Sequence, residues 1–211
     1  MGFLENITVG TVLHEIGQIM KIPCMVILII LAVIAVWQIG DFLMELFAER
    51  RTRQKDIEGL LDSLRSCGKE GLSETIRQSS LPRAEKRMLE KLADSGGWSR
   101  SERTVMAQKY LADEEARYER RTAIPEILAK QGPIYGLLGT LIPLGPGIIA
   151  LGLGDTETLS GAIGIAFDTT IAGLLAAAVG SLISNIRNRW YDGYLADFEA
   201  LLEYVLEGVS E

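Results

Sequence analysis

Three long stretches of the chain are almost free of charged residues, and each is long enough to cross a lipid bilayer. Residues 22–40 and 131–154 contain no Asp, Glu, Lys or Arg, and residues 158–186 contain only Asp168. A helix needs about 20 apolar residues to cross roughly 30 Å of hydrocarbon. A helix in a water-soluble core would show polar residues at every third or fourth position, and these stretches do not. The pattern predicts an all-α integral membrane protein with three transmembrane helices.

The first apolar stretch does not have the features of a cleavable signal peptide. The flank that precedes it, residues 1–21, is long and slightly acidic, and no small-x-small cleavage site follows the apolar run. We therefore expect a retained transmembrane helix that continues through Phe42 and Phe47.

Strongly basic flanks occur at one set of ends of the three stretches, and the opposite ends carry the single base Lys21. Lys and Arg are in excess in cytoplasmic loops, so the strongly basic ends are predicted to be cytoplasmic and the N-terminus is predicted to lie outside. The basic flanks are Arg50, Arg51, Arg53 and Lys55, then Arg120, Arg121 and Lys130, and finally Arg187 and Arg189. The opposite ends carry mainly acidic residues, so the assignment is consistent at every end.

This topology divides the chain into six segments. They are an extracytoplasmic amphipathic segment (1–21), the first span (22–47), a cytoplasmic helical region (48–130), the second span (131–154), the third span (158–186) and a cytoplasmic helical tail (187–211). Breaks at Cys67–Gly68, Ser80–Pro82 and Ser95–Trp98 predict several helices in the cytoplasmic region. An apolar stripe among the acids of the tail predicts that the third helix continues into the cytoplasm and packs on other helices.

The second and third spans are rich in small residues, unlike the bulky first span. Small residues let helix backbones approach closely in a bilayer, so they indicate helix–helix contacts or a pore lining. With about 3.6 residues per turn, they form one stripe on each helix. The stripes are Gly136, Thr140, Pro143 and Gly147 on the second helix, and Ala166, Thr170, Gly173, Ala177, Gly180 and Ser184 on the third.

Thr140 and Thr170 lie near the middle of these two helices. Their hydroxyls have two interpretations: they bond to the backbone or to a neighbouring helix as structural groups, or they face a pathway for ions. Residue type and position leave both open.

The residues around these threonines resemble motifs of the ExbB/TolQ/MotA proton-channel family. Pro133-Ile134-Tyr135-Gly136-Leu137-Leu138-Gly139-Thr140 is similar to the second-helix pattern P-x-x-G-L-x-G-T of ExbB and TolQ. Thr170-Ile171-Ala172-Gly173-Leu174, with Asn185 further on, is similar to their third-helix pattern T-x-x-G-L…N. The motifs cover only residues 133–185, whereas the predicted topology resembles the family over the whole chain.

The resemblance implies a homo-oligomer, a pentamer in this family, in the cytoplasmic (inner) membrane of a prokaryote. Its second and third helices would line a central lumen that encloses the membrane helices of a single-span partner of ExbD, TolR or MotB type. That partner carries a membrane Asp that takes up and releases the transported proton. Thr140 and Thr170 would face the lumen, and Gly136, Gly139, Pro143, Gly173, Ala177, Ser184 and Asn185 would pack the helices or line it.

Asp168 departs from the family pattern. ExbB and TolQ carry a glutamate five residues before the third-helix threonine, and Ile165 occupies that position here. Placing a charged residue in a membrane helix costs free energy, so such residues commonly have a function. Asp168 is about 160° around the helix from Thr170, so we expect it outside the lumen stripe. It is either a proton or cation relay toward a neighbouring subunit or a protonated carboxyl that holds helices together.

Other functions fit less well. A non-conducting oligomeric scaffold shares every feature except the paired threonines and Asp168, and a flagellar-type stator subunit would have four spans. Gly152-Leu153-Gly154-Asp155 and Tyr191-Asp192 match intramembrane aspartyl-protease signatures, but the two acids lie a membrane thickness apart. The net charge of -7 disfavours nucleic-acid binding, and Cys24 and Cys67 lack metal-ligand neighbours. We predict no enzymatic activity, no metal and no cofactor.

Overall fold

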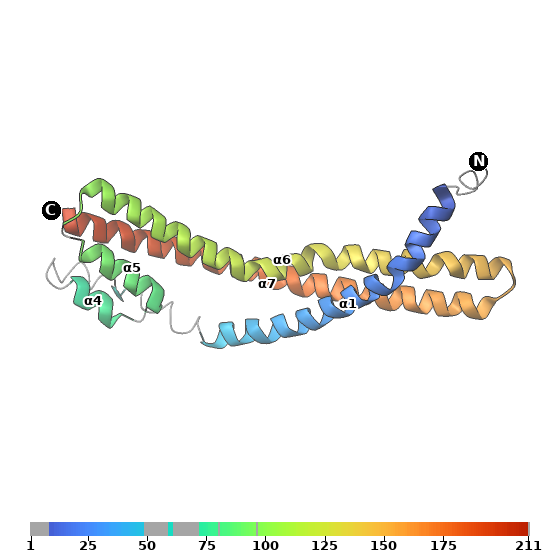
Figure 1. Cartoon of the computed structure of the whole chain (residues 1–211). Coiled ribbons are helices and arrows are strands. Elements are labelled where there is room, and N and C mark those ends of the chain that lie inside the picture. Colours follow the sequence, from blue (N-terminus) through green and yellow to red (C-terminus); the bar gives the residue numbers. More distant parts are fainter. Residues whose placement is uncertain (1–8, 49–58, 61–71, 80, 96, 211) are drawn as a thin grey trace, which may run out of the picture. The chain divides into compact units, whose positions relative to one another are not determined.

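In the computed structural model, residues 9–48, 59–60, 72–79, 81–95 and 97–210 are described, and they contain helices and no strand. The longer helices are α1 (Val9–Ala48), α6 (Arg100–Gly152) and α7 (Thr156–Ser210). Two short helices, α4 (Leu72–Gln78) and α5 (Arg83–Ala93), lie between α1 and α6 in the sequence. Figure 1 shows these elements.

By length and apolar composition, α1, α6 and α7 can each cross a membrane, which confirms the predicted all-α fold with three such helices. All three extend beyond the predicted spans, and only the extension of α7 into the tail was predicted. α1 begins at Val9 and α6 at Arg100, since a helix continues through polar residues where its backbone remains hydrogen-bonded. The segment boundaries, the outside N-terminus and the cytoplasmic location of residues 48–130 stay predictions.

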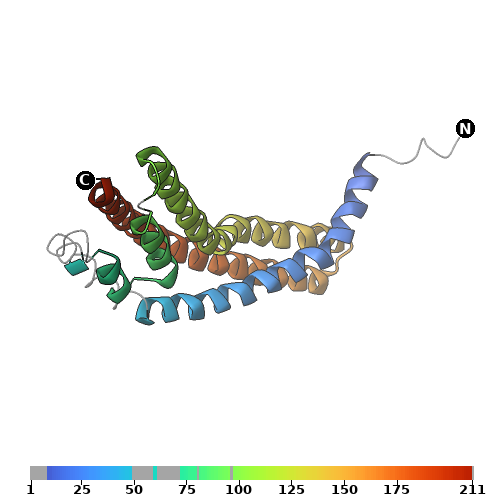
Figure 2. The same ribbon diagram turned by 60° about the vertical axis from the view of Figure 1, so that its left-hand side comes forward.

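The described chain forms two compact units. Unit 1 comprises the described residues of Met1–Gly40 and Ile124–Ser184, and unit 2 comprises those of Asp41–Ala123 and Asn185–Glu211. The interior of unit 1 includes a small cluster of Leu31 and Ala35 from α1, Leu128 from α6 and Ala176 from α7. In unit 1, α6 and α7 run side by side as an antiparallel hairpin, which Figure 2 shows from a second direction.

The hairpin turn closes with a Schellman motif at the end of α6. Gly154 has a φ of +83°, and its N–H donates to the Leu151 carbonyl at 3.0 Å. The Asp155 N–H donates to the Ala150 carbonyl at 2.9 Å. The left-handed conformation at Gly154 favours glycine, which explains why the helix ends there. The turn is shorter than the sequence indicates, because α7 already begins at Thr156, where the Asp155 carboxylate accepts the Thr158 N–H at 2.9 Å.

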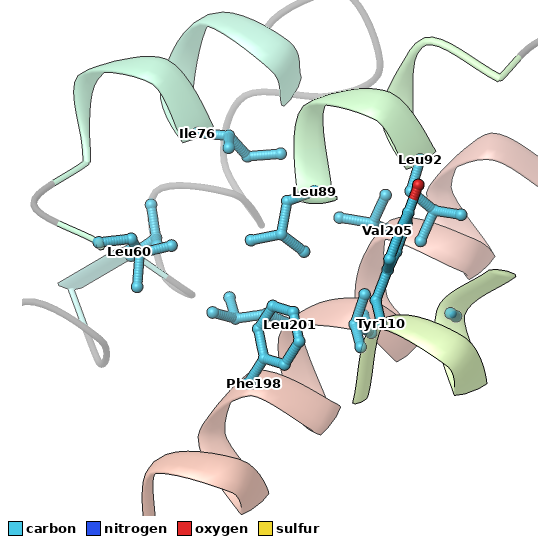
Figure 3. Packing of buried hydrophobic residues seen from close by; sticks show 11 residues of the cluster. Leu60, Ile76, Leu89, Leu92, Tyr110, Phe198, Leu201 and Val205 are labelled. Atoms are coloured by element: carbon cyan, nitrogen blue, oxygen red, sulfur yellow. The ribbon is translucent and has the colours of Figure 1, made fainter. Parts of the chain in front are cut away.

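Unit 2 has the larger apolar core, and Figure 3 shows how its side chains converge. Phe198, Leu201 and Val205 lie on one face of α7 and are at most 1% exposed. They pack with Leu89 and Leu92 of α5. The core also includes Leu60, Ile76, Leu81, Ala107, Tyr110 and Leu202. This confirms the predicted amphipathic packing of the tail helix.

Helix boundaries between α4 and α6 follow the predicted breaks. α4 ends at Gln78 and α5 begins after Pro82, while α5 ends at Ala93 and α6 begins at Arg100. A capping box starts α6: the Ser99 hydroxyl accepts the Glu102 N–H at 3.3 Å, and the Glu102 carboxylate accepts the Ser99 N–H at 2.7 Å. The break predicted at Cys67–Gly68 lies outside the described residues.

Candidate functional site

The two helices of the hairpin approach each other backbone to backbone. A Cβ placed on Gly132 would lie 2.6 Å from the carbonyl oxygen of Gly173, and one on Gly180 would lie 2.5 Å from the carbonyl oxygen of Pro125. These separations leave no room for a side chain. The glycines therefore let α6 and α7 pack more closely than other residues allow.

The hairpin brings Thr140 and Thr170 to the same level. A Cβ placed on Gly173 would lie 2.8 Å from the Gly136 Cα, which shows that these two glycines face each other. Thr140 is four residues after Gly136, and Thr170 is three residues before Gly173. Because the helices are antiparallel, both threonines lie about one turn away from the glycine contact in the same direction.

Both threonine hydroxyls donate to their own helices. The Thr140 hydroxyl donates to the Leu137 carbonyl at 2.7 Å, and the Thr170 hydroxyl donates to the Ala166 carbonyl at 3.0 Å. Each residue is half-buried, so the hydroxyls are not sealed inside the chain. A hydroxyl that donates to the backbone still has lone pairs, so each oxygen is available as a hydrogen-bond acceptor.

Thr169 is a third hydroxyl in this region, and the sequence motifs did not identify it. Its hydroxyl donates to the carbonyls of Ile165 and Ala166, each at 2.9 Å. A Cβ placed on Gly139 would lie 2.6 Å from the Thr169 Cβ, so Thr169 also packs against α6. Its place beside Thr170 at the start of the third-helix motif is the only sequence signal for it.

Asp168 lines a groove on the other side of α7, between α7 and α1. The groove has a volume of about 280 Å³, and Thr169 is the only other polar residue in its wall. The remaining lining residues are Met25, Leu28, Ile29, Ala32, Ile165 and Ala172. Asp168 is exposed, whereas Thr170 faces Gly136 of α6. The structure thus places the carboxyl and the two motif threonines at different surfaces.

The remaining predicted site residues divide between the two units. In unit 1, Ala177 and Ser184 are buried, and a Cβ placed on Gly132 would lie 3.0 Å from the Ala177 Cβ. Gly136, Gly139, Pro143 and Gly173 are buried as well. In unit 2, Asn185 is exposed. Packing within the chain therefore accounts for most of the small-residue stripe.

A charged cluster in unit 2 was not predicted. The Arg187 guanidinium donates through one Nη atom to the Asp41 carboxylate and through Nε to the Glu45 carboxylate, each at 2.7 Å. Its other Nη atom donates to the Arg121 carbonyl at 3.3 Å. The Arg187 side chain is 3% exposed and that of Glu45 is 9% exposed. The hydroxyl of Tyr191 donates to Glu45 as well.

An aromatic stack extends this cluster. The rings of Tyr118 and Tyr191 lie 4.4 Å apart between centroids with an interplanar angle of 23°. The Tyr118 hydroxyl donates to the buried Glu85 carboxylate at 3.3 Å. Hydrogen bonds and ring stacking thus connect α1, α6, α7 and α5 within unit 2. The i,i+4 spacing of Asp41 and Glu45 after the first apolar stretch is the signal that could have indicated a basic partner.

Comparison with known proteins supports the sequence resemblance. A search of curated proteins finds no match to this chain. The family model described as the MotA/TolQ/ExbB proton channel family matches residues 74–200, which is more than half of the chain. The matched region begins within α4 and includes both helices of the hairpin with its threonines, but not α1. The chain therefore belongs to the MotA/TolQ/ExbB proton channel family.

Proposed function

We propose that this chain is the proton-conducting subunit of an ExbB/TolQ-like membrane motor complex. The complex would use the proton-motive force to move or energise a single-span partner of ExbD, TolR or MotB type. The observation that carries the proposal is the pairing of Thr140 and Thr170 at one level of a glycine-packed hairpin, in a chain of the proton channel family.

The proposed complex lies in the cytoplasmic membrane of a prokaryote, with the N-terminus outside and residues 48–130 and 187–211 in the cytoplasm. A ring of identical chains, a pentamer, encloses the partner's membrane helices. The outer surface of the hairpin supports assembly of this kind, because large apolar side chains cover it. Leu137 and Leu141 of α6 are 60% and 59% exposed, and Ile171 and Leu175 of α7 are 57% and 63% exposed. Lipid or neighbouring chains must cover these side chains.

The threonine hydroxyls support a defined chemical role. Each donates its proton to a backbone carbonyl, so toward the lumen each acts as an acceptor. A protonated carboxyl on the partner is a donor, and an ionised carboxyl is not. The hydroxyls would therefore favour the protonated form of the partner's Asp and release it after deprotonation.

Asp168 supports a second step in the same function. Its groove lies between α7 and α1, so a carboxyl there would relay protons outside the lumen stripe and toward a neighbouring chain. The alternative is a protonated Asp168 that hydrogen-bonds a neighbouring helix and stabilises the ring.

Proton flux in reconstituted vesicles tests the main proposal. The chain is first purified in mild detergent with its co-expressed single-span partner, and native mass spectrometry counts the subunits. The complex is then inserted into vesicles with a pH-sensitive dye inside. Thr140→Val and Thr170→Val remove the hydroxyls at nearly constant volume and should lower the flux, whereas Thr140→Ser and Thr170→Ser should preserve it. Unchanged flux in the two valine variants would refute the role of the hydroxyls.

A non-conducting scaffold is the second candidate, and one observation favours it. Both hydroxyls are bonded within their own helices, and most of the small-residue stripe packs inside the chain. The scaffold predicts a stable oligomer that captures no partner and carries no flux above empty vesicles. A pentamer that captures a smaller single-span protein with a membrane Asp would exclude it.

A further inference from the structure

The part of α7 in unit 2 presents an acidic face to solvent. Glu199, Glu203 and Glu207 are all exposed and follow one another at four-residue spacing. Asp192 is one further exposed acid on the same face. The exposed residues beside these acids, Gly193, Ala196 and Ala200, are small. Residues 192–211 contain no Lys or Arg that could neutralise these acids locally. The small neighbouring side chains leave this face shallow, and the acids make it strongly negative.

A matching basic face lies on α5. Arg83, Arg87 and Lys91 are exposed and also follow one another at four-residue spacing. The half-buried Glu90 and the exposed Asp94 lie beside them and reduce, but do not cancel, the positive charge. Rows of this spacing advance about 12 Å along a helix and drift about 80° around it. The two rows therefore have the same length and the same pitch.

The two rows point away from each other within one chain. Leu89 and Leu92 of α5 pack in the same core as Phe198 and Leu201 of α7. The basic row occupies the side of α5 that is remote from this core, and the acidic row occupies the remote side of α7. One copy of the chain cannot bring its own rows together while this core is intact.

We propose that the basic row of α5 (Arg83, Arg87 and Lys91) docks on the acidic row of α7 (Glu199, Glu203 and Glu207) of a second copy of this chain. Each copy then offers one row to each neighbour, which is a head-to-tail contact, and such contacts close into a ring when the rotation permits. The small residues of α7 allow a helix to approach closely. This inference rests on the proposed ring assembly and names a contact that builds it.

Among the described residues of α4 and α6, the other exposed charges fit the acidic row less well. On α6, exposed bases such as Lys109 and Arg117 alternate with the exposed acids Asp113, Glu115 and Glu119. On α4, Arg77 already pairs with Glu74 at 3.5 Å. Complementary rows of charge orient partners and select among them, even where each exposed pair adds little affinity. The contact should therefore determine which face of one copy packs on which face of its neighbour.

Charge reversal with rescue tests the contact. In one variant Arg83, Arg87 and Lys91 become Glu, in a second Glu199, Glu203 and Glu207 become Lys, and a third combines both sets. Native mass spectrometry and sedimentation at low and high salt measure the fraction in the ring. Each single-row variant should lose about tenfold or more of the ring relative to monomer, because like charges then face each other. The combined variant should restore the ring, since opposite charges face each other again.

Two matched controls carry the same charge changes outside the rows. Asp113, Glu115 and Glu119 are changed to Lys in one control, and Arg100, Lys109 and Arg120 are changed to Glu in the other. Both controls should assemble normally. Circular dichroism confirms that every variant keeps its helical content, so that loss of the ring is not loss of the fold.

The possible outcomes separate this inference from the proposed function. If the unmodified chain never forms a ring, the proposed assembly fails and this contact fails with it. If the ring forms and survives reversal of either row, the contact is wrong while the proposed function stands. If both single-row variants lose the ring and the combined variant does not regain it, the rows do not meet each other and the contact is also wrong. Only one outcome supports the contact: both single-row variants lose the ring and the combined variant regains it.

Discussion

The Nε atom of Arg187 donates to the Glu45 carboxylate at 2.7 Å, although 142 residues separate the two in the sequence. Both side chains are nearly inaccessible to solvent, so the pair has lost its hydration. A second carboxylate, that of Asp41, and the Arg121 carbonyl complete the coordination of the guanidinium. This arrangement fixes the end of α1 against α7 within unit 2.

Removing the guanidinium should therefore destabilise the protein strongly. Arg187→Met would leave Glu45 buried without its main partner, and breaking a buried ion pair on one side costs about 3–5 kcal/mol. Chemical unfolding in a fixed detergent, followed by circular dichroism, measures the loss. Arg189→Met is the matched control, because Arg189 is exposed on the same helix. Equal stability of the two variants would show that the cluster contributes nothing.

The glycine contacts predict a sharp difference between two alanine substitutions on α7. Gly180→Ala places a Cβ against the Pro125 backbone and should cost about 1–3 kcal/mol of stability, as overpacking in a tight interior does. Gly161→Ala meets nothing within 4 Å and should cost nothing. Thermal unfolding of the two variants in the same detergent provides the comparison. A harmless Gly180→Ala would mean that the helices are less closely packed than described.

The proposed relay role of Asp168 predicts a change in proton flux rather than in stability. If its carboxyl relays protons, Asp168→Asn should lower the flux of the reconstituted complex by about tenfold or more, because the amide cannot exchange a proton in the same way. Asp168→Glu should retain most of the flux. Native mass spectrometry must first show that each variant assembles normally. Normal flux through an assembled Asp168→Asn complex would leave the carboxyl a structural role only.

The hairpin turn predicts a pH-dependent contribution to stability. Hydrogen bonds from the hydroxyl and the backbone N–H of Thr158 hold the pKa of the Asp155 carboxyl below its ordinary value. A lowered pKa in the folded state stabilises the fold at pH values above the unfolded pKa, roughly 3.9, and this contribution disappears as the pH falls through the folded pKa.

Asp155→Ala should therefore lower the unfolding temperature at neutral pH, and its difference from the unmodified protein should shrink in acid. Asp155→Asn keeps a side-chain acceptor at the helix start, so its stability should vary less with pH. Thermal unfolding across the acid range measures both effects. A constant difference between Asp155→Ala and the unmodified protein at every pH would contradict the ionised cap.

The sequence predicts features that depend on the solvent around a helix or on spacing along it. Charge-free stretches indicated three spanning helices because hydrocarbon excludes charge, and helical spacing placed Gly136 and Gly173 on stripes that the structure brings into contact. The short gap between the second and third predicted spans indicated the turn, and the structure closes it at Gly154. Each of these follows from local chemistry alone.

Pairings between distant segments were not predictable in the same way. Arg187 looked like an ordinary basic flank, since nothing near it in the sequence reveals Asp41 or Glu45 as its partners. Thr169 was missed because the motif pattern begins one residue later. The continuity of α6 from Arg100 through the second span was also missed, because the charge pattern changes near Lys130 while the backbone remains helical. These features depend on tertiary contacts or on backbone continuity, which composition does not report.

The backbone contacts at Gly132, Gly173 and Gly180 have a mechanical consequence. Two helices that touch through side chains can slide, because rotamers adjust as one surface moves past the other. Here carbonyl oxygens and glycine Cα atoms form the contact, and they have no rotamers to adjust. Shear between α6 and α7 in unit 1 is therefore blocked, and the hairpin behaves as one stiff rod. In the proposed complex, any working stroke would then occur at the outer surfaces of this rod, where it would meet lipid, neighbouring chains or the partner.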